Sequence, residues 1–139
     1  MRTDIRAFQP EHHAQALALW ESTEGVGLSD ADSFENIRRF LDHNPGLSLV
    51  AIEQQAVVAT ILCGHDGRRG LIHHLAVAPS HRRQGLGRAL VAQALAALRR
   101  CGIQKCHLLV FQDNAPGRAF WEHLGAEERT TLSIYSMQT

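Results

Sequence analysis

A run of arginines and glycines at residues 82–88 has the composition of an anion-binding loop. It lies between an apolar, strand-like segment and a long helical pattern, and its members are Arg82, Arg83, Gln84, Gly85, Leu86, Gly87 and Arg88. The first backbone N–H groups of a helix have no partner within the helix, and the helix dipole favours negative charge beside them. Glycine lets a phosphate approach the backbone closely, and arginine supplies charged donors. The loop therefore predicts a pyrophosphate site.

Two other kinds of phosphate loop are excluded by the residues that follow Gly87. A Walker A loop continues with Lys and Ser or Thr, whereas Gly87 is followed by Arg88. A dinucleotide fingerprint that begins at Gly85 requires Gly or Ala at its sixth position, which is Leu90 here, and no acidic residue stands near Lys105, about 20 residues on. A helix start that binds nothing is the remaining alternative, but it would not need clustered arginines.

The elements that position this loop alternate along the chain. Apolar residues that recur every second position predict strands, and a period of 3.6 residues predicts helices. Asp32 with Glu35 resembles a capping box at the start of a helix. The expected strands are residues 4–8, 47–53, 56–63, 71–77, 104–111 and 130–137, and the expected helices begin at Pro10 and cover residues 34–41, 85–100 and 115–124. Residues 71–111 should form a parallel crossover, because a helix separates two strands. We expect an α/β fold with a mixed, mostly antiparallel central sheet and helices on both faces.

Composition limits the classes of function. The 139 residues suit one domain, residues 1–139, with zero formal net charge and a pI of about 7.1. This balance argues against nucleic acid or an anionic membrane as the main partner. Nine histidines and three cysteines show no metal-ligand spacing, so we expect no metal. Three cysteines without a Cys-x-x-Cys pair, behind a polar N-terminus, favour reduced thiols and a cytoplasmic location.

Two motifs together resemble a known family. The Arg-x-x-Gly-x-Gly run at residues 82–87, behind Leu75, Ala76 and Val77, resembles the acetyl-CoA loop of the GNAT superfamily of N-acetyltransferases. Residues 114–126 are similar to that family's second motif, which commonly has Asn, a small residue, Tyr-Glu-Lys and then Gly-Phe. The resemblance covers nearly the whole chain. It implies acetyl-CoA as cosubstrate, an amine of a small molecule or peptide as acceptor, and in some members a homodimer paired through sheet edges.

The same resemblance implies roles for individual residues. The cofactor-binding set would be Leu75, Ala76, Val77, Arg82, Arg83, Gln84, Gly85, Leu86, Gly87, Arg88 and Asn114. Backbone groups of Leu75 and Val77 would pair with the pantetheine arm, and a bulge at this strand would expose them. The amides of residues 83–88 would hold the pyrophosphate. Asn114 would lie beside the pantetheine or thiol, and a helix cap before Pro116 is its alternative role.

Acyl transfer by direct attack in a ternary complex requires a neutral amine. A lysine-like amine has a pKa of about 10.4, so its neutral form costs about 4–5 kcal/mol at pH 7, and a general base lowers that cost. We predict His73 as the base, because it shares one strand face with Leu75 and Val77, whereas His74 should face the other way. There are two alternatives to this role. His73 would only pack in the sheet, or Glu21 and Glu24 would line the acceptor entrance instead.

The general acid is left open by the sequence. The family often uses the tyrosine of its second motif, and Trp121 stands at that position, while Tyr135 is the only tyrosine in the chain. The leaving thiolate would take its proton from the product ammonium or from water. A CoA-binding module without catalysis, serving as a sensor or interaction domain, is the alternative function, and transfer of a longer acyl group is a third.

Overall fold

The apolar segments in the middle of the chain form a five-stranded sheet. In this computed structural model, which describes residues 2–139, the chain forms two compact units divided after Leu109. The first unit contains β1 (Asp4–Ala7), α1 (His13–Glu21), α2 (Phe34–His43), β2 (Leu49–Glu53), β3 (Ala56–His65), β4 (Gly70–Val77), α3 (Leu86–Arg100) and β5 (Cys106–Leu108), with 3-10 turns η1 (Pro10–His12), η2 (Asp30–Asp32) and η3 (Pro79–His81). The second unit contains α4 (Ala115–His123).

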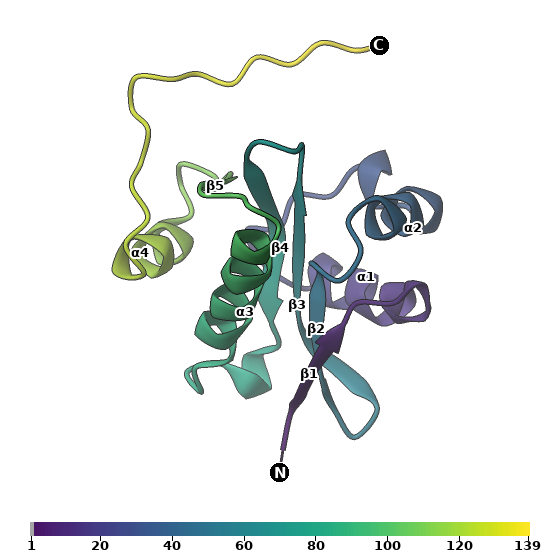
Figure 1. The fold of residues 1–139 in the computed structure, drawn as a ribbon. Helices are drawn as coiled ribbons and strands as arrows, with labels where there is room; N and C mark the ends of the chain where they lie inside the picture. The colour runs from purple at the N-terminus through teal and green to yellow at the C-terminus, as the bar shows by residue number, and fades with distance from the viewer. Residues whose placement is uncertain (1) are drawn as a thin grey trace. The chain divides into compact units, whose positions relative to one another are not determined.

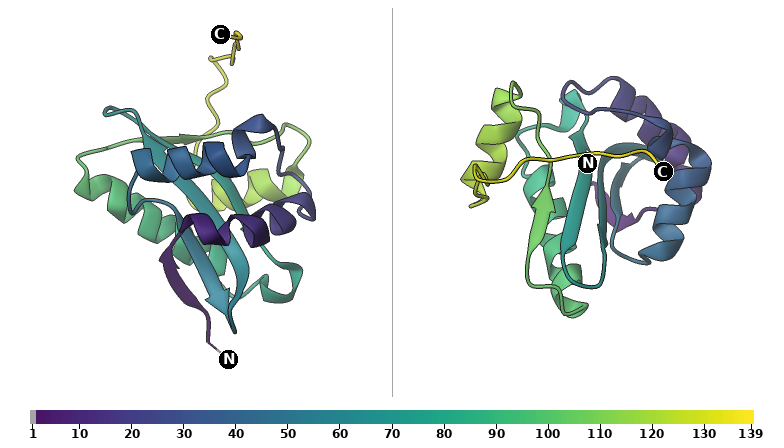
Figure 2. Two further views of the ribbon diagram at one scale, coloured as in Figure 1. Left: turned by 90° about the vertical axis from the view of Figure 1, so that its right-hand side faces the viewer. Right: turned by 90° about the horizontal axis from the view of Figure 1, so that it is seen from above.

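The sheet of the first unit has the order β1-β2-β3-β4-β5. All neighbouring strands are antiparallel except β4 and β5, which α3 joins as a parallel crossover. Helices α1 and α2 cover one face of the sheet and α3 covers the other (Figures 1 and 2). These observations confirm the predicted fold class. None of the described helices is long and apolar enough to cross a membrane.

Each face of the sheet has its own core. On the face covered by α1 and α2, a cluster that includes Phe8, Trp20 and Ile37 packs against β2, β3 and β4. On the opposite face, α3 buries Leu90 and Leu98 at spacings that keep them on one side of the helix. Full burial of one such large apolar side chain contributes about 1.5–3 kcal/mol. Both faces of β3 are therefore covered, which explains why residues 57–64 are buried without alternation.

A bulge interrupts the pairing of β3 with β4. Thr60 pairs with Ala76 and Leu62 pairs with His73, so two residues of β4, His74 and Leu75, lie opposite one residue of β3. His74 has a φ of 49°, a left-handed conformation that is uncommon outside glycine. The bulge that the family resemblance implied at this strand is confirmed. It also reverses one expectation, because His74 lies on the same cleft as His73 and not on the opposite face.

Buried hydrogen bonds hold the bulge in place. The indole Nε1 of Trp20 donates to Thr60 Oγ1 over 2.8 Å, and that hydroxyl donates to the carbonyl of His74 over 2.8 Å. Trp20 and Thr60 are both fully buried. The Trp20 ring also contacts the His74 imidazole, with ring centroids 4.7 Å apart. The first helix is thereby connected to the residue that distorts β4.

Two local predictions were wrong, and a third was correct only in part. Residues 130–137 form no strand, and their apolar side chains, such as Ile134 and Met137, are exposed, because alternation marks a face that can be buried but supplies no neighbouring strand. The strand expected at residues 104–111, after α3, is present but covers only Cys106–Leu108. Helix α2 is capped by Ser33, whose hydroxyl accepts from Asn36 N, while Asp32 caps the preceding turn with Ser29. The expectation of a single domain stays a prediction.

Thr60→Val should destabilise the fold although the two side chains have the same shape. The substitution leaves the Trp20 N–H and the His74 carbonyl without partners, and each buried unpaired group costs about 1–3 kcal/mol. Thr60→Ser keeps the hydroxyl and is the matched control, with an expected loss of about 1 kcal/mol because one buried methyl group is removed. Urea denaturation followed by far-ultraviolet circular dichroism measures both. Equal stability of Thr60→Val and the wild type would contradict the role of this hydroxyl.

Candidate active site

The loop between β4 and α3 adopts an unusual backbone conformation. Arg83 has a φ of 61° and Gly85, which is the N-cap of α3, has a φ of 77°. No atom lies within 4 Å of a Cβ built on Gly85, so the requirement for glycine there comes from the backbone angle and not from crowding. A left-handed residue at a non-glycine position costs about 1 kcal/mol or more, and such strain is often found at functional sites.

This conformation leaves a row of backbone donors without partners. None of the N–H groups of residues 83–88 donates to an acceptor within the described part of the chain. The first intrahelical bond nearby runs from Ala89 N to the carbonyl of Gly85, over 3.0 Å. The side chains of Arg83 and Arg88 are exposed and form no ion pair among residues 2–139. Consecutive amides and guanidinium groups without partners offer the donors that a polyanion would require.

Side chains fasten this loop to the sheet. The Nε of Arg82 donates to the Val77 carbonyl over 3.0 Å, so this arginine ties the loop to the end of β4. His81 Nε2 lies 3.0 Å from a carboxylate oxygen of Glu53 at the end of β2, and its Nδ1 lies 2.7 Å from the Ser80 hydroxyl. Both His81 and Glu53 are mostly buried. The loop is thereby anchored at both strands before α3 begins.

The edge of β4 next to the loop has no strand partner. β5 pairs with β4 only from Gly70 to Ile72 and ends at Leu108. Residues 73–77 therefore have an open edge on the β5 side among the described residues. An open strand edge presents backbone donors and acceptors that can pair with an extended ligand. Leu75 and Val77, which sequence reasoning selected for this purpose, both lie on this stretch.

A cleft of about 560 Å³ opens beside the bulge, within the first unit. Its walls are the segment before α2, one face of α2, and the strands β3 and β4. The lining residues are Gly27, Ser29, Ala31, Asp32, Asn36, Ile37, Arg39, Phe40, His43, Asn44, Leu62, His73 and His74. A cleft of this size accommodates a small molecule. Glu21 and Glu24, the alternative acceptor residues from the sequence, do not line it.

His73 presents its imidazole to this cleft. The ring lies against Phe40, with centroids 6.0 Å apart, and neither ring nitrogen is hydrogen-bonded to another described residue. Burial lowers the pKa of His73 below its usual value of 6.5, the nearby His74 lowers it further, and Asp32 opposes both effects. The imidazole is therefore neutral at pH 7 and has a lone pair available to accept a proton.

His74 and Asp32 form a pair that sequence reasoning missed. His74 Nε2 lies 2.7 Å from Asp32 Oδ1, and the side chains are only 15% and 9% exposed. Because a carboxylate only accepts, Nε2 carries the proton. The other oxygen, Oδ2, accepts from Ser29 N over 3.0 Å, and the Asp32 carbonyl lies 2.8 Å from His13 Nε2. Asp32 thus connects α1, the segment before α2 and the bulge of β4.

Asn114 belongs to the second unit. Its Oδ1 accepts from Gly117 N over 3.1 Å, so it caps α4, as the alternative interpretation expected. Trp121 on the same helix contacts Phe120, with ring centroids 5.2 Å apart. A role for Asn114 beside the cofactor stays a prediction.

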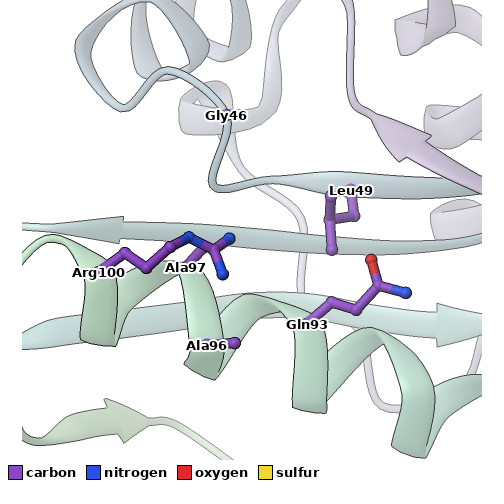
Figure 3. Close-up of a pocket in the computed structure, with 6 residues that line it drawn as sticks. All are labelled: Gly46, Leu49, Gln93, Ala96, Ala97 and Arg100. Atoms are coloured by element: carbon purple, nitrogen blue, oxygen red, sulfur yellow. The ribbon is translucent and has the colours of Figure 1, made fainter.

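A second, smaller pocket lies on the face covered by α3. It measures about 210 Å³ and is lined by Gly46, Leu49, Gln93, Ala96, Ala97 and Arg100 (Figure 3). Its walls are mostly small or aliphatic, and Arg100 is its single charged residue. No residue of the loop at residues 82–88 or of the bulge lines it, so we assign it no part in the site.

Asp32→Asn should lower the stability of the first unit. The amide cannot accept from Ser29 and from His74 with the strength of a carboxylate, and a weakened buried pair of this kind costs about 1–3 kcal/mol. Asp30 lies in the same turn, and its side chain forms no hydrogen bond or ion pair within residues 2–139. The control substitution Asp30→Asn should therefore change stability by about 0.5 kcal/mol or less. Thermal denaturation compares them. Equal melting temperatures for the two variants would contradict the connecting role of Asp32.

Comparison with known proteins finds a family whose model matches most of the chain. Residues 13–126 match the model of the Acetyltransferase (GNAT) family. An acetyltransferase of Photorhabdus laumondii is 34% identical over 131 residues, which cover 94% of this chain and 91% of the relative.

Solved structures of other acetyltransferases share the fold. PaiA N-acetyltransferase from Thermoplasma acidophilum, in complex with coenzyme A, has a TM-score of 0.76 at 18% identity and covers 89% of both chains. An aminoglycoside antibiotic 6'-N-acetyltransferase from Acinetobacter haemolyticus has a TM-score of 0.78 at 19% identity, covering 98% of this chain and 99% of that one. With the family model spanning most of its length, the chain belongs to the acetyltransferase (GNAT) family.

Proposed function

We propose that this acetyltransferase uses acetyl-CoA to acetylate a primary amine by direct attack in a ternary complex. The observation that carries the proposal is the continuity between the open edge of β4 at residues 73–77 and the unpaired amides of residues 83–88. The pantetheine arm of acetyl-CoA is extended, carries amide groups and is joined to a pyrophosphate. It would pair with the open edge of β4, and its pyrophosphate would lie at the unpaired amides that follow. The complex of PaiA N-acetyltransferase with coenzyme A supports this choice of ligand.

The cofactor would be held mainly by backbone groups. Leu75, Ala76 and Val77 would pair with the pantetheine amides as an added strand. The amides of residues 83–88, with the guanidinium groups of Arg83 and Arg88, would bind the pyrophosphate. Backbone donors fixed by the strained loop need little reorganisation on binding, so less of the interaction energy is lost in ordering the site.

His73 would act as the general base. Its neutral imidazole lines the cleft beside the bulge, where an acceptor amine would lie. The amine would lose its proton to His73 and attack the thioester carbonyl, and the Val77 N–H or a neighbour would stabilise the oxyanion. The C–S bond would then break, and the thiolate would take a proton from the product ammonium or from water.

His73→Gln should lower kcat about 100-fold, since general-base catalysis of this kind typically contributes that much or more. In the wild type, kcat should fall as the pH drops through a value below 6.5, because burial lowers the pKa of His73 and the protonated ring cannot accept a proton. This acid limb should be absent from His73→Gln. Release of free CoA thiol across an amine panel measures both effects, with His123→Gln, an exposed histidine on α4, as the control.

Two outcomes would contradict the proposal. An acid limb that persists in His73→Gln would assign the titration to another group. No thiol release by the wild type with any amine, in a protein that binds acetyl-CoA, would favour the alternative of a CoA-binding sensor or interaction module.

A further inference from the structure

The cleft beside the bulge is lined by basic groups that lack an acidic partner. Asn36, Arg39, Phe40 and His43 lie three or four residues apart, so they share the face of α2 that lines the cleft. Arg39 donates from Nη1 to Asn36 Oδ1 over 2.8 Å. Neither Arg39 nor His43 forms an ion pair with any carboxylate of residues 2–139.

The neighbouring arginine on the same helix is neutralised. Arg38 Nη2 lies 3.3 Å from Glu35 and its Nη1 lies 3.2 Å from Asp42. Neither of these acidic residues lines the cleft. Helix α2 thus carries ion-paired charge away from the cleft and an unpaired guanidinium toward it. The interaction with Asn36 orients that guanidinium without cancelling its charge.

The cleft offers no carboxylate for a second cation. Asp32 is its single acidic lining residue, and both of its oxygens are already used, Oδ1 by His74 and Oδ2 by Ser29 N. An acceptor with several ammonium groups would have to place one of them beside the Arg39 guanidinium, and like charges repel. The lining therefore disfavours polyamines and aminoglycosides.

We infer that the acceptor is an amine that also carries a carboxylate, of the amino acid class. This inference rests on the proposed function, and it names the acceptor for the same site. The Arg39 guanidinium would bind the carboxylate through two parallel N–H donors, with His43 beside it, while the amine faces His73. Residues on one helix would then decide which amines are accepted, and a histidine on β4 would serve the reaction itself.

The test compares free L-phenylalanine and L-methionine with their amides and with phenethylamine and 3-methylthiopropylamine. The side chains match within each series, and only the carboxylate is removed. The amides are informative because their amines lose a proton at least as easily as those of the free amino acids. CoA thiol release at saturating acetyl-CoA gives kcat and KM for wild type, Arg39→Gln, Arg39→Lys and the matched control Arg38→Gln.

We expect the wild type to prefer the free amino acids by at least about tenfold in kcat/KM. Arg39→Gln should raise KM for them by about tenfold with little change in kcat, and should leave the amides unaffected. Arg39→Lys should recover part of the loss, and Arg38→Gln should behave as wild type. Amides or decarboxylated amines acetylated as well as the amino acids, with the ratio unchanged in Arg39→Gln, would overturn this inference and leave the proposed function intact. Absence of thiol release with every amine would instead overturn the proposed function, and this inference with it.

Discussion

The hydrogen-bonded chain from Trp20 through Thr60 to the carbonyl of His74 is the interaction on which the rest of the site depends. In it, one buried hydroxyl both accepts and donates a hydrogen bond, and the chain ends at the residue whose φ of 49° creates the bulge in β4. Without the bulge, β4 would alternate regularly, and one of the two histidines would lie on the other face of the sheet. The core of the first unit therefore determines the chemistry at its edge.

The bulge has different consequences on the two sides of β4. Toward α2, it brings His73 and His74 to one cleft, where Asp32 holds the second of them. Toward β5, pairing stops at Ile72, and the backbone beyond it is left open. Under the proposed function, one distortion would thus provide side-chain chemistry for an acceptor and backbone chemistry for a cofactor, at positions only one or two residues apart.

The loop that follows uses strain in a comparable way. Arg83 is left-handed, and Gly85 begins α3 in the same region of φ. The Arg82–Val77 and His81–Glu53 contacts hold this geometry from within the chain. Because the amides are already oriented, a bound pyrophosphate would replace water without rearranging the chain.

Much of this was predictable from residue types and spacing. Sequence alone was enough to predict the loop at residues 82–88, the fold class and the β4–α3–β5 crossover. Glycine, arginine and apolar periodicity act locally, so these features can be predicted without knowledge of distant contacts. The His74–Asp32 pair was not, since its members lie 42 residues apart and meet only through the bulge. An alternating pattern does not reveal that a strand contains one extra residue. The bulge implied by the family resemblance was the available signal that both histidines could share a face. The prediction of a strand at residues 130–137 was wrong for a related reason. Strand pairing depends on a partner segment, and the local pattern carries no information about that partner.

The most direct test of the central claim is isothermal titration of the purified protein with acetyl-CoA, CoA and ATP, beside Gly87→Glu and the control Gln93→Glu. The glutamate at position 87 places a negative charge among the amides at the start of α3, and the one at the exposed position 93 adds the same charge farther along the helix. The account predicts roughly micromolar binding of both CoA species, much weaker binding of ATP, and loss of CoA binding in Gly87→Glu alone. Absence of CoA binding by the folded wild type, or binding that Gly87→Glu leaves unchanged, would contradict it.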